Sequence, residues 1–302
     1  MKHRKGDAVN GWLILDKPAG MGSTYIVNLT RRLLNAKKNG HIGTLDPFAS
    51  GVLPIAFGET TKLIDFLDDE TKEYEFTIQW GIATDSADSE GQIIETCNKI
   101  PKKEEILQII PLFIGQIKQT PPIFSAVKIN GKRAYDLARQ GQEVIIAERT
   151  VNIYKLEYCG NLPNNQTSFK VCCSKGTYIR SLGRDMAKML GTCGYLCRLR
   201  RTRAGIFDEK SEISLETLQN MLYVDERRKF LLPSETSLGG IAVMAVSEVE
   251  AAKLCHGQAL SPKERENLFP LQTIVAAVCD KRLVALVRIE ETKISPIRVF
   301  NL

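Results

Sequence analysis

Residues 41–54 read His-Ile-Gly-Thr-Leu-Asp-Pro-Phe-Ala-Ser-Gly-Val-Leu-Pro. The stretch has neither a helical nor a strand period, and its two glycines and Pro47 predict a rigid loop. Pro47 also disfavours the helical conformation for Asp46, the residue before it. Asp46 therefore either caps a turn, as aspartates before proline commonly do, or acts as a reactive carboxylate. The histidine and threonine of the same loop place an imidazole and a hydroxyl near it, which favours the second interpretation.

The segments around this loop mix strands and helices. Residues 74–80 alternate apolar and polar side chains, which is typical of a half-buried strand. An apolar helical face begins after Ser23, a suitable N-cap, and Gly40 is a suitable end. We expect further strands over residues 11–17, 125–129 and 169–174, and further helices over residues 102–113, 134–140 and 177–190, the last capped by Thr177. Because no regular strand–helix–strand repeat is present, the order predicts an α+β fold.

The chain divides into a large and a small predicted domain. Residues 233–240 are rich in proline, serine and glycine, which is typical of a boundary. We expect one domain over residues 1–235 and a second over residues 236–302. Short apolar runs beyond residue 241 predict that the second domain is all-β.

Composition limits the class of protein. The chain has 302 residues, of which 43% are hydrophobic and 25% charged, as is ordinary for a globular protein. Its longest apolar runs, such as residues 241–246, fall far short of the roughly 20 residues that span a bilayer. The basic first residues precede no apolar stretch of signal-peptide length, so we expect a cytoplasmic protein. A net charge of +6 permits a polyanionic partner without requiring one.

Motifs for common cofactors and metals are missing from the sequence. No phosphate-binding loop, dinucleotide fingerprint, zinc-peptidase motif or hydrolase nucleophile motif is present. Cys193 and Cys197 are close in sequence, but no second pair completes a zinc set, so we expect the eight cysteines to be buried thiols. The acidic residues 84–91 do not have the spacing of a calcium loop. We therefore expect no metal.

Several segments resemble, in order and spacing over residues 9–205, the pseudouridine synthases, and within them the bacterial tRNA pseudouridine-55 synthase (TruB) family. The loop with Asp46 resembles the catalytic motif of these enzymes. The other matching segments are Leu15–Gly20, Gly58–Lys62, Lys72–Tyr74, Thr84–Gly91, Pro121–Gly141, Cys173–Arg180 and Leu199–Thr202. Residues 283–300 resemble the family more weakly.

The resemblance implies a pseudouridine synthase fold, with a mixed, mostly antiparallel sheet flanked by helices and loops. It also implies that residues 1–235 form the catalytic domain and residues 236–302 a small β-rich RNA-binding domain of PUA type. The implied reaction converts the T-loop uridine at position 55 of tRNA to pseudouridine. The N-glycosidic bond breaks, the base turns, and it rejoins the sugar through carbon 5. The resemblance implies no cofactor, no membrane and no obligate protein partner, and we expect a monomer.

Three residues carry the chemistry that the resemblance implies. Asp46 is the nucleophile, and an unperturbed aspartate is ionised at neutral pH. Arg180 is its ion partner, expected to lower the pKa of the Asp46 carboxyl; otherwise it is an exposed residue in the first turn of its helix. Tyr74 stacks on the uracil and relays the proton lost from carbon 5; otherwise it is a core aromatic.

Four further residues are implied to bind the substrate. His41 resembles a histidine that stacks in the RNA near the vacated base position, and Tyr178 and Leu199 resemble residues of the uridine pocket. Lys62 is assigned to RNA or active-site electrostatics. Each has an ordinary alternative as a solvated or packing residue. Lys17–Pro18 resembles structural support under the site, and basic segments 37–38, 128–133 and 198–203 are expected to hold RNA phosphates.

Two other functions are compatible with the residues. A non-catalytic RNA-binding protein could use the same fold, but it has no need of a carboxylate facing RNA. A hydrolase that cleaves N-glycosidic bonds would need a group that activates water, and the sequence shows no second carboxylate in an evident motif. Asp46 and the release of free uracil distinguish the three.

Overall fold

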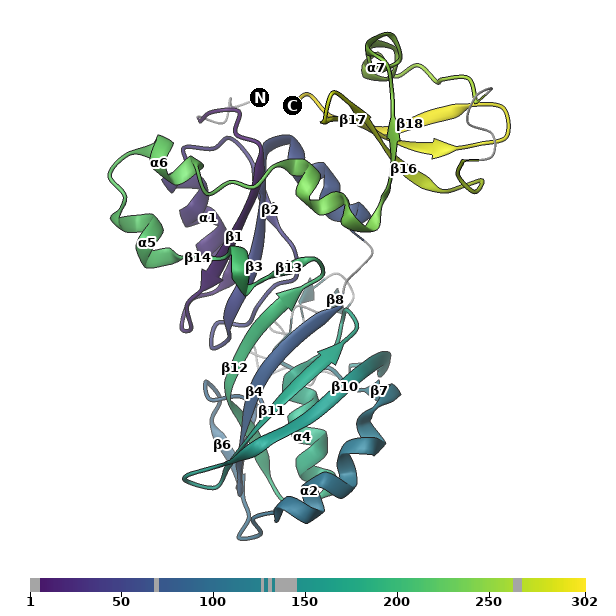
Figure 1. Cartoon of the computed structure of the whole chain (residues 1–302). Coiled ribbons are helices and arrows are strands. Elements are labelled where there is room, and N and C mark those ends of the chain that lie inside the picture. Colours follow the sequence, from purple (N-terminus) through teal and green to yellow (C-terminus); the bar gives the residue numbers. More distant parts are fainter. Residues whose placement is uncertain (1–5, 68–70, 126–127, 130–131, 134–145, 263–267) are drawn as a thin grey trace.

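The computed structural model describes residues 6–67, 71–125, 128–129, 132–133, 146–262 and 268–302 (Figure 1). Ten strands form one large sheet in the order β14-β1-β3-β12-β4-β11-β10-β7, with β2 on β3 and β13 on β12. They are β1 (Gly11–Lys17), β2 (Asn39–His41), β3 (Ser50–Phe57), β4 (Lys72–Trp80), β7 (Gly115–Gln119), β10 (Arg149–Leu162), β11 (Gln166–Cys173), β12 (Gly194–Ala204), β13 (Phe207–Asp208) and β14 (Ile213–Ser214).

Helices and short hairpins complete the larger part of the chain. The helices are α1 (Ser23–Leu33), η1 (Gly58–Phe66), α2 (Lys103–Ile109), η2 (Ile110–Phe113), α4 (Ile179–Met189), η3 (Glu209–Ser211), α5 (Leu215–Asn220), α6 (Val224–Arg228) and η4 (Ser234–Gly240). The hairpins are β5 (Ile82–Thr84) with β6 (Ile93–Thr96) and β8 (Lys128–Ile129) with β9 (Lys132–Arg133).

The large sheet is mixed and mostly antiparallel, which confirms the predicted α+β class. Only the pairs β1 with β14 and β3 with β12 are parallel among its described strands. Every second side chain of β4, from Tyr74 to Trp80, is buried, as the alternation predicted. β1 is buried on both faces because its residues 12–15 are all apolar.

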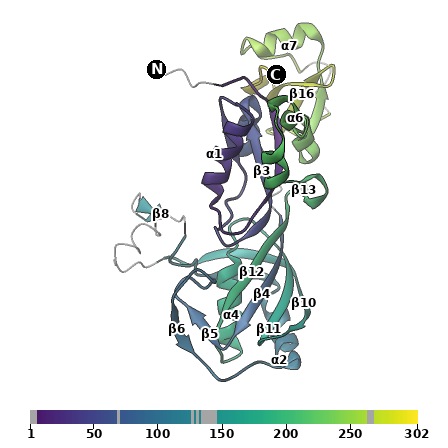
Figure 2. The same ribbon diagram turned by 90° about the vertical axis from the view of Figure 1, so that its left-hand side faces the viewer.

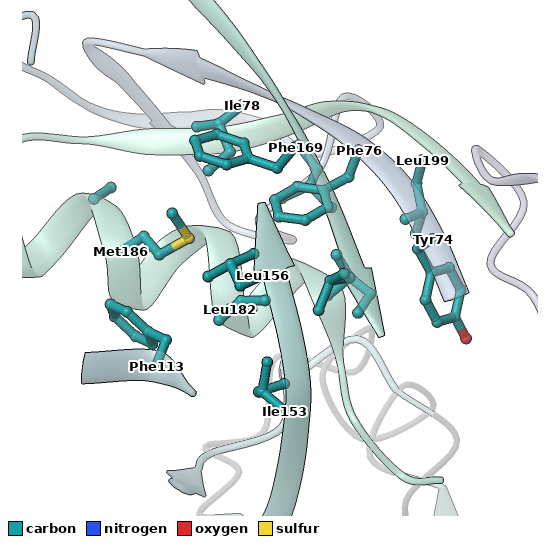
Figure 3. Packing of buried hydrophobic residues seen from close by; sticks show 14 of the residues in the cluster. Tyr74, Phe76, Ile78, Phe113, Ile153, Leu156, Phe169, Leu182, Met186 and Leu199 are labelled. Atoms are coloured by element: carbon teal, nitrogen blue, oxygen red, sulfur yellow. The ribbon is translucent and has the colours of Figure 1, made fainter. Parts of the chain in front are cut away.

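An apolar cluster holds α2 and α4 to the large sheet. α2 and α4 lie together on one face of the sheet (Figures 1 and 2). There Leu182 and Met186 of α4 pack against the stacked rings of Phe76 and Phe169, whose centroids are 5.2 Å apart (Figure 3). Tyr74 at the start of β4 also belongs to this cluster.

The C-terminal part forms its own sheet, in the order β15-β16-β17-β18. Its elements are β15 (Ala242–Ala245), α7 (Glu248–Cys255), β16 (Ile274–Cys279), β17 (Arg282–Ile289) and β18 (Ile294–Val299). The prediction of an all-β module was wrong, because α7 is present and Ser247 caps it in a capping box with Glu250. The predicted boundary at 235/236 falls inside η4, just before this sheet.

Three predicted helix ends differ from the structure. α1 ends at Leu33, and Gly40 lies in β2. Neither Ser23 nor Thr177 caps its helix; the Ser23 hydroxyl instead binds the backbone of Leu45, and the Thr177 hydroxyl binds that of Ser174. In both places the hydroxyl binds a backbone carbonyl outside the helix instead of an amide of the first helical turn.

Some expectations concern residues or side chains outside those described. They are the helix 134–140, the turn at 130–131 and the side chains of 128–133. Of the cysteines, Cys173, Cys193 and Cys279 are buried as predicted, whereas Cys159 and Cys255 are exposed. No helix among the described segments is long and apolar enough to cross a membrane. Within these segments no three acidic, histidine or cysteine side chains are grouped to hold a metal ion.

Candidate active site

The loop that carries Asp46 is fixed on both sides of that residue. On one side, the Ser23 hydroxyl donates to the Leu45 carbonyl at 2.7 Å and accepts from the Leu45 amide at 2.9 Å. On the other, the fully buried Lys17 ammonium donates to the Pro47 carbonyl at 3.2 Å. Lys17 also binds the carbonyls of residues 18 and 21, so it joins the turn after β1 to the loop. This is the structural support expected of Lys17.

Asp46 and Arg180 form the predicted ion pair. Arg180 Nε lies 2.9 Å from Asp46 Oδ2, and only 3% of the arginine side chain is exposed. About a third of the Asp46 side chain (34%) remains exposed, enough to meet a substrate. Arg180 is held in place by two carbonyls, those of Ser86 at 3.0 Å and Phe124 at 2.9 Å.

A second carboxylate, which the sequence interpretation missed, shares the same arginine. Asp88 Oδ2 lies 3.1 Å from Arg180 Nη1, and its side chain is 4% exposed. Its other oxygen accepts the Ser86 hydroxyl at 2.6 Å and the Glu90 amide at 3.0 Å. From the sequence, the acidic segment 84–91 is rejected as a calcium loop and matched to the family, but Asp88 is assigned no role. The signal that could have indicated Asp88 is its place in the acidic segment 84–91, which is one of the segments that resemble the family.

Burial, Arg180 and a neighbouring carboxylate together set the pKa of Asp46. Burial raises the pKa of the Asp46 carboxyl, and this effect outweighs the lowering by Arg180. The nearby Asp88 carboxylate raises the pKa of Asp46 further. Arg180 lowers the pKa of the Asp46 carboxyl, as expected, but it is shared with Asp88 and does not offset the effect of burial.

A pocket of about 220 Å³ opens beside Asp46. It collects side chains from the Asp46 loop, β4, β12 and the start of α4. Among the residues that line it are Asp46, Tyr74, Tyr178 and Leu199, four of the seven predicted site residues. Its other lining residues are Gly43, Thr44, Leu45, Lys72, Gly176, Thr177, Ile179 and Arg201.

Tyr74 forms the inner wall of this pocket. It is 8% exposed and lies beside Leu199 at the edge of the core, with its hydroxyl directed away from the other labelled side chains (Figure 3). Burial raises the pKa of Tyr74 to about 12, although the Arg201 guanidinium opposes the rise. The phenol is therefore protonated at neutral pH and is no base in the empty pocket.

Tyr178 also lines the pocket. It is the N-cap residue of α4, two positions before Arg180. Its amide donates to Gln119 Oε1 at 2.8 Å, and the Arg149 guanidinium lies 5.0 Å from its ring centroid. These contacts orient the ring without closing the pocket.

His41 and Lys62 lie outside the residues that line the pocket. His41 Nε2 is 3.1 Å from the Thr44 hydroxyl, and burial together with Arg201 lowers the pKa of its imidazole. Lys62 instead pairs with Glu59 at 2.5 Å and donates to the Val299 carbonyl at 2.8 Å. The structure therefore places Lys62 at the contact with the C-terminal sheet, away from Asp46.

Three of the four arginines in the basic run 198–203 are bound to groups of the protein itself, which weakens the expectation that the whole run holds RNA. Arg201 is fully buried and donates to the Val52 carbonyl at 2.8 Å. Arg200 pairs with three carboxylates, those of Asp16, Glu209 and Glu212, and Arg203 pairs with Glu73. Arg198 is exposed and remains suitable for RNA. The strand period could have indicated Arg201, because it shares a face of β12 with Leu199.

The sequence of this chain is similar to those of known proteins along its whole length. Residues 31–179 match the model of the TruB family pseudouridylate synthase N-terminal domain, and residues 180–239 match that of the tRNA pseudouridylate synthase B C-terminal domain. A relative from Caulobacter vibrioides called tRNA pseudouridine synthase B is 46% identical, over 100% of this chain and 99% of its own length. One of the same name from Ehrlichia canis is 43% identical over 96% of this chain and 97% of its own.

Solved structures share the fold. A chain of a complex titled "Crystal Structure of a Cbf5-Nop10-Gar1 Complex" is 26% identical with a TM-score of 0.71, over 96% of this chain and 84% of that one. A chain in a structure of an H/ACA RNP bound to a substrate RNA containing 2′-deoxyuridine has the same TM-score at 24% identity, over 97% of this chain and 85% of that one. With near full-length relatives at more than 40% identity, this chain belongs to the TruB family of pseudouridine synthases.

Proposed function

We propose that this chain converts the T-loop uridine at position 55 of tRNA to pseudouridine, with Asp46 as the nucleophile. The observation that carries the proposal is Asp46 itself. It is a partly exposed carboxylate, paired with a buried arginine, at a pocket that also contains an aromatic wall. Family membership and the names of the relatives support the same reaction.

The reaction is an isomerisation, so its atoms balance within the substrate. The target base leaves the RNA stack and enters the pocket. The bond between N1 and C1′ breaks and its electron pair stays with the base. Asp46 engages the substrate covalently, at the sugar carbon or at the base. The base then joins C1′ through C5, Asp46 is released, C5 loses a proton and N1 gains one.

The other pocket residues position the base. Tyr74 and Tyr178 offer aromatic rings to the base, and Leu199 lies next to Tyr74. Since the Tyr74 phenol is protonated at neutral pH, it accepts the C5 proton only after its pKa has been lowered by the bound intermediate. His41, whose lowered pKa keeps its imidazole neutral, stacks in the RNA outside the pocket.

Binding of the tRNA needs cationic groups outside the pocket. Lys37, Lys38 and Arg198 are exposed and are proposed to contact phosphates. The C-terminal sheet is proposed to be the PUA-type RNA-binding domain and to contact the tRNA away from the reacting base. We further propose that the enzyme acts as a monomer without an obligate protein partner.

Hydrolysis of the N-glycosidic bond is less well supported by the geometry. Asp88 is buried and all of its bonds are to protein groups, so it is not available to activate a water molecule. Glu90 is exposed and electrostatically coupled to Asp46, which makes it the one described carboxylate near Asp46 to test for that role. Hydrolysis would release free uracil, whereas isomerisation releases none.

The proposal is tested with tRNA labelled with tritium at carbon 5 of uridine. The protein should release tritium and form pseudouridine without free uracil. Asp46→Asn should lower the rate by about 10³-fold or more while tRNA affinity stays within about threefold, because the amide is isosteric but not nucleophilic. Asp185→Asn, which changes an aspartate of α4 outside the pocket, is the matched control. Substantial release by the Asp46 variant would refute the nucleophile assignment.

A further inference from the structure

We propose that Lys72 is a substrate-binding residue that stabilises the negative charge on the uracil base while its bond to the sugar is broken. The inference deepens the proposed function and rests on it. Lys72 lines the same pocket as Asp46 and Tyr74. Arg180, which is bound to Asp46 and Asp88, is not among the residues that line this pocket.

The strand period places Lys72 on the same face of β4 as Tyr74. Lys72 is the first residue of β4, two positions before Tyr74. Successive even-numbered side chains of β4, from Tyr74 to Trp80, point into the core, so Lys72 extends the same row beyond the end of the apolar cluster. The row thus runs from apolar residues through the tyrosine to a cation.

Contacts at Gly43 locate the ammonium group. A Cβ atom built on Gly43 would lie 3.3 Å from Lys72 Nζ and 2.9 Å from an Arg201 guanidinium nitrogen. Gly43 itself lines the pocket and has a φ of +61°. Both cations therefore lie against the backbone of the loop that carries Asp46. A larger residue at position 43 would displace them.

Arg201 and Lys72 differ in how accessible their charged groups are to a bound substrate. Arg201 is fully buried, and its guanidinium binds the Val52 carbonyl and faces Tyr74. Lys72 is only partly buried and has three donors on a flexible stem. Its side chain also borders a second, largely apolar cavity lined by Phe66 and Ile206. A lysine placed between an apolar cavity and a polar pocket keeps its stem in the first and its charge in the second.

The chemistry needs such a charge. When the bond between N1 and C1′ breaks with its electron pair on the base, negative charge spreads over N1 and the two carbonyl oxygens of uracil. A fixed cation at the pocket wall stabilises this charge more than the neutral bound uridine, which is the condition for accelerating the step. The same contact keeps the detached base in the pocket while it turns.

The test compares substrates that differ only in how well the base carries charge. Fluorine at carbon 5 withdraws electrons and stabilises the uracil anion, so RNA with 5-fluorouridine at the target position depends less on an enzymatic cation. Loss of the parent nucleoside is followed in single-turnover reactions with saturating enzyme. Lys72→Met should slow uridine consumption by about 100-fold, with RNA affinity within about threefold. The loss with 5-fluorouridine should be at least about tenfold smaller, and Lys72→Arg should recover part of the rate.

Controls separate this role from others. Lys170→Met changes a lysine of the neighbouring strand β11 that pairs with Glu75 outside the pocket, and it should behave as wild type. Equal rate losses of Lys72→Met on both substrates would indicate a structural role and overturn the proposal. A loss confined to affinity, with a shallower salt dependence, would indicate a phosphate contact and overturn it too. If Lys72→Met melts early, Lys72→Gln is judged by the same ratio.

Failure of the inference is distinct from failure of the proposed function. If the wild-type protein forms no pseudouridine, the proposed function falls and the substrate comparison has no baseline. If the wild-type protein is active and the Lys72 variants react like wild type on uridine, only the inference falls.

Discussion

At the scale of single residues, two opposing effects set the pKa of the Asp46 carboxyl. Burial raises the pKa of Asp46, and the Arg180 guanidinium lowers it. With Asp46 as the proposed nucleophile only the ionised carboxylate reacts, so the acidic limb of the pH–rate profile should report this balance. The limb should lie above the ordinary aspartate range, because the raising effect prevails.

Removing the guanidinium should shift that limb in a defined direction. In Arg180→Ala the lowering influence is lost while burial and Asp88 remain, so the pKa of Asp46 rises further and the acidic limb moves to higher pH. We expect turnover at pH 7 to fall by at least about 100-fold. The measurement is kcat against pH at saturating tRNA. Arg184→Ala, which changes an arginine one turn later that pairs with Asp185, is the control. A limb at the same pH in both variants would contradict the assignment.

The sequence indicated the residues proposed to contact the substrate better than it indicated the residues that hold them in place. Asp46, Tyr74, Tyr178 and Leu199 occupy motif positions, and the structure brings them to one pocket. Arg201 was taken for an RNA contact because a run of arginines looks solvated. The position of β12 between β3 and β4 buries this side chain, on the same strand face as Leu199.

At the scale of elements, the active-site loop depends on contacts from segments that are remote in sequence. The first turn of α1 holds Leu45 through Ser23, and the end of β1 holds Pro47 through Lys17. Asp46 therefore has little freedom although its loop has no regular structure. Local rules assigned Ser23 to a helix cap, because they do not include a loop more than twenty residues away.

This support can be tested at Ser23. Ser23→Ala removes both bonds to Leu45 and leaves its backbone amide and carbonyl without these partners, so the free energy of unfolding should fall by about 1–3 kcal/mol. Because Asp46 is the next residue, kcat should fall by about 10- to 100-fold, and KM should change little. Urea denaturation and steady-state kinetics measure the two effects. The exposed neighbour gives a control, Thr24→Ala, and equal kinetics in the two variants would contradict a positioning role for the clamp.

The boundaries of elements were harder to predict than their type. The alternation of β4 gave its buried face correctly because half-burial imposes a period of two. α7 was missed since its eight residues lie among short apolar runs and have little amphipathic contrast. Its capping box, Ser247 with Glu250, is the local signal that could have indicated it.

At the scale of the whole molecule, the two sheets are joined through a shared apolar core. Trp12, Ile14 and Leu63 of the larger part pack in one cluster with Leu283 and Phe300 of the smaller. Polar contacts border it, including Lys62 to the Val299 carbonyl and Glu59 to the Asn301 amide. Both termini of the described chain lie on this side of the molecule (Figure 1). The sequence showed a boundary but not this contact, which arises only when residues far apart in the chain meet.

The shared core bears on how the C-terminal domain should be tested. Deleting residues beyond 240 would expose Trp12 and its neighbours, so lost activity would not separate RNA binding from misfolding. Phe300→Ala keeps the chain complete and removes one ring that is 3% exposed. A buried phenylalanine truncated to alanine costs about 3–5 kcal/mol, which should loosen the smaller sheet from the larger.

If the smaller sheet supports tRNA binding from a fixed position, Phe300→Ala should weaken tRNA affinity by about tenfold while single-turnover rates at saturating enzyme stay within about threefold. Thermal melting should show a lower or split transition, and limited proteolysis should cut near residues 240–242 first. Val249→Ala on the exposed side of α7 is the matched control and should leave both properties unchanged. A loosened domain with unchanged affinity would remove the C-terminal sheet from the binding surface, and an equal fall in the single-turnover rate would mean that its docking supports the pocket instead.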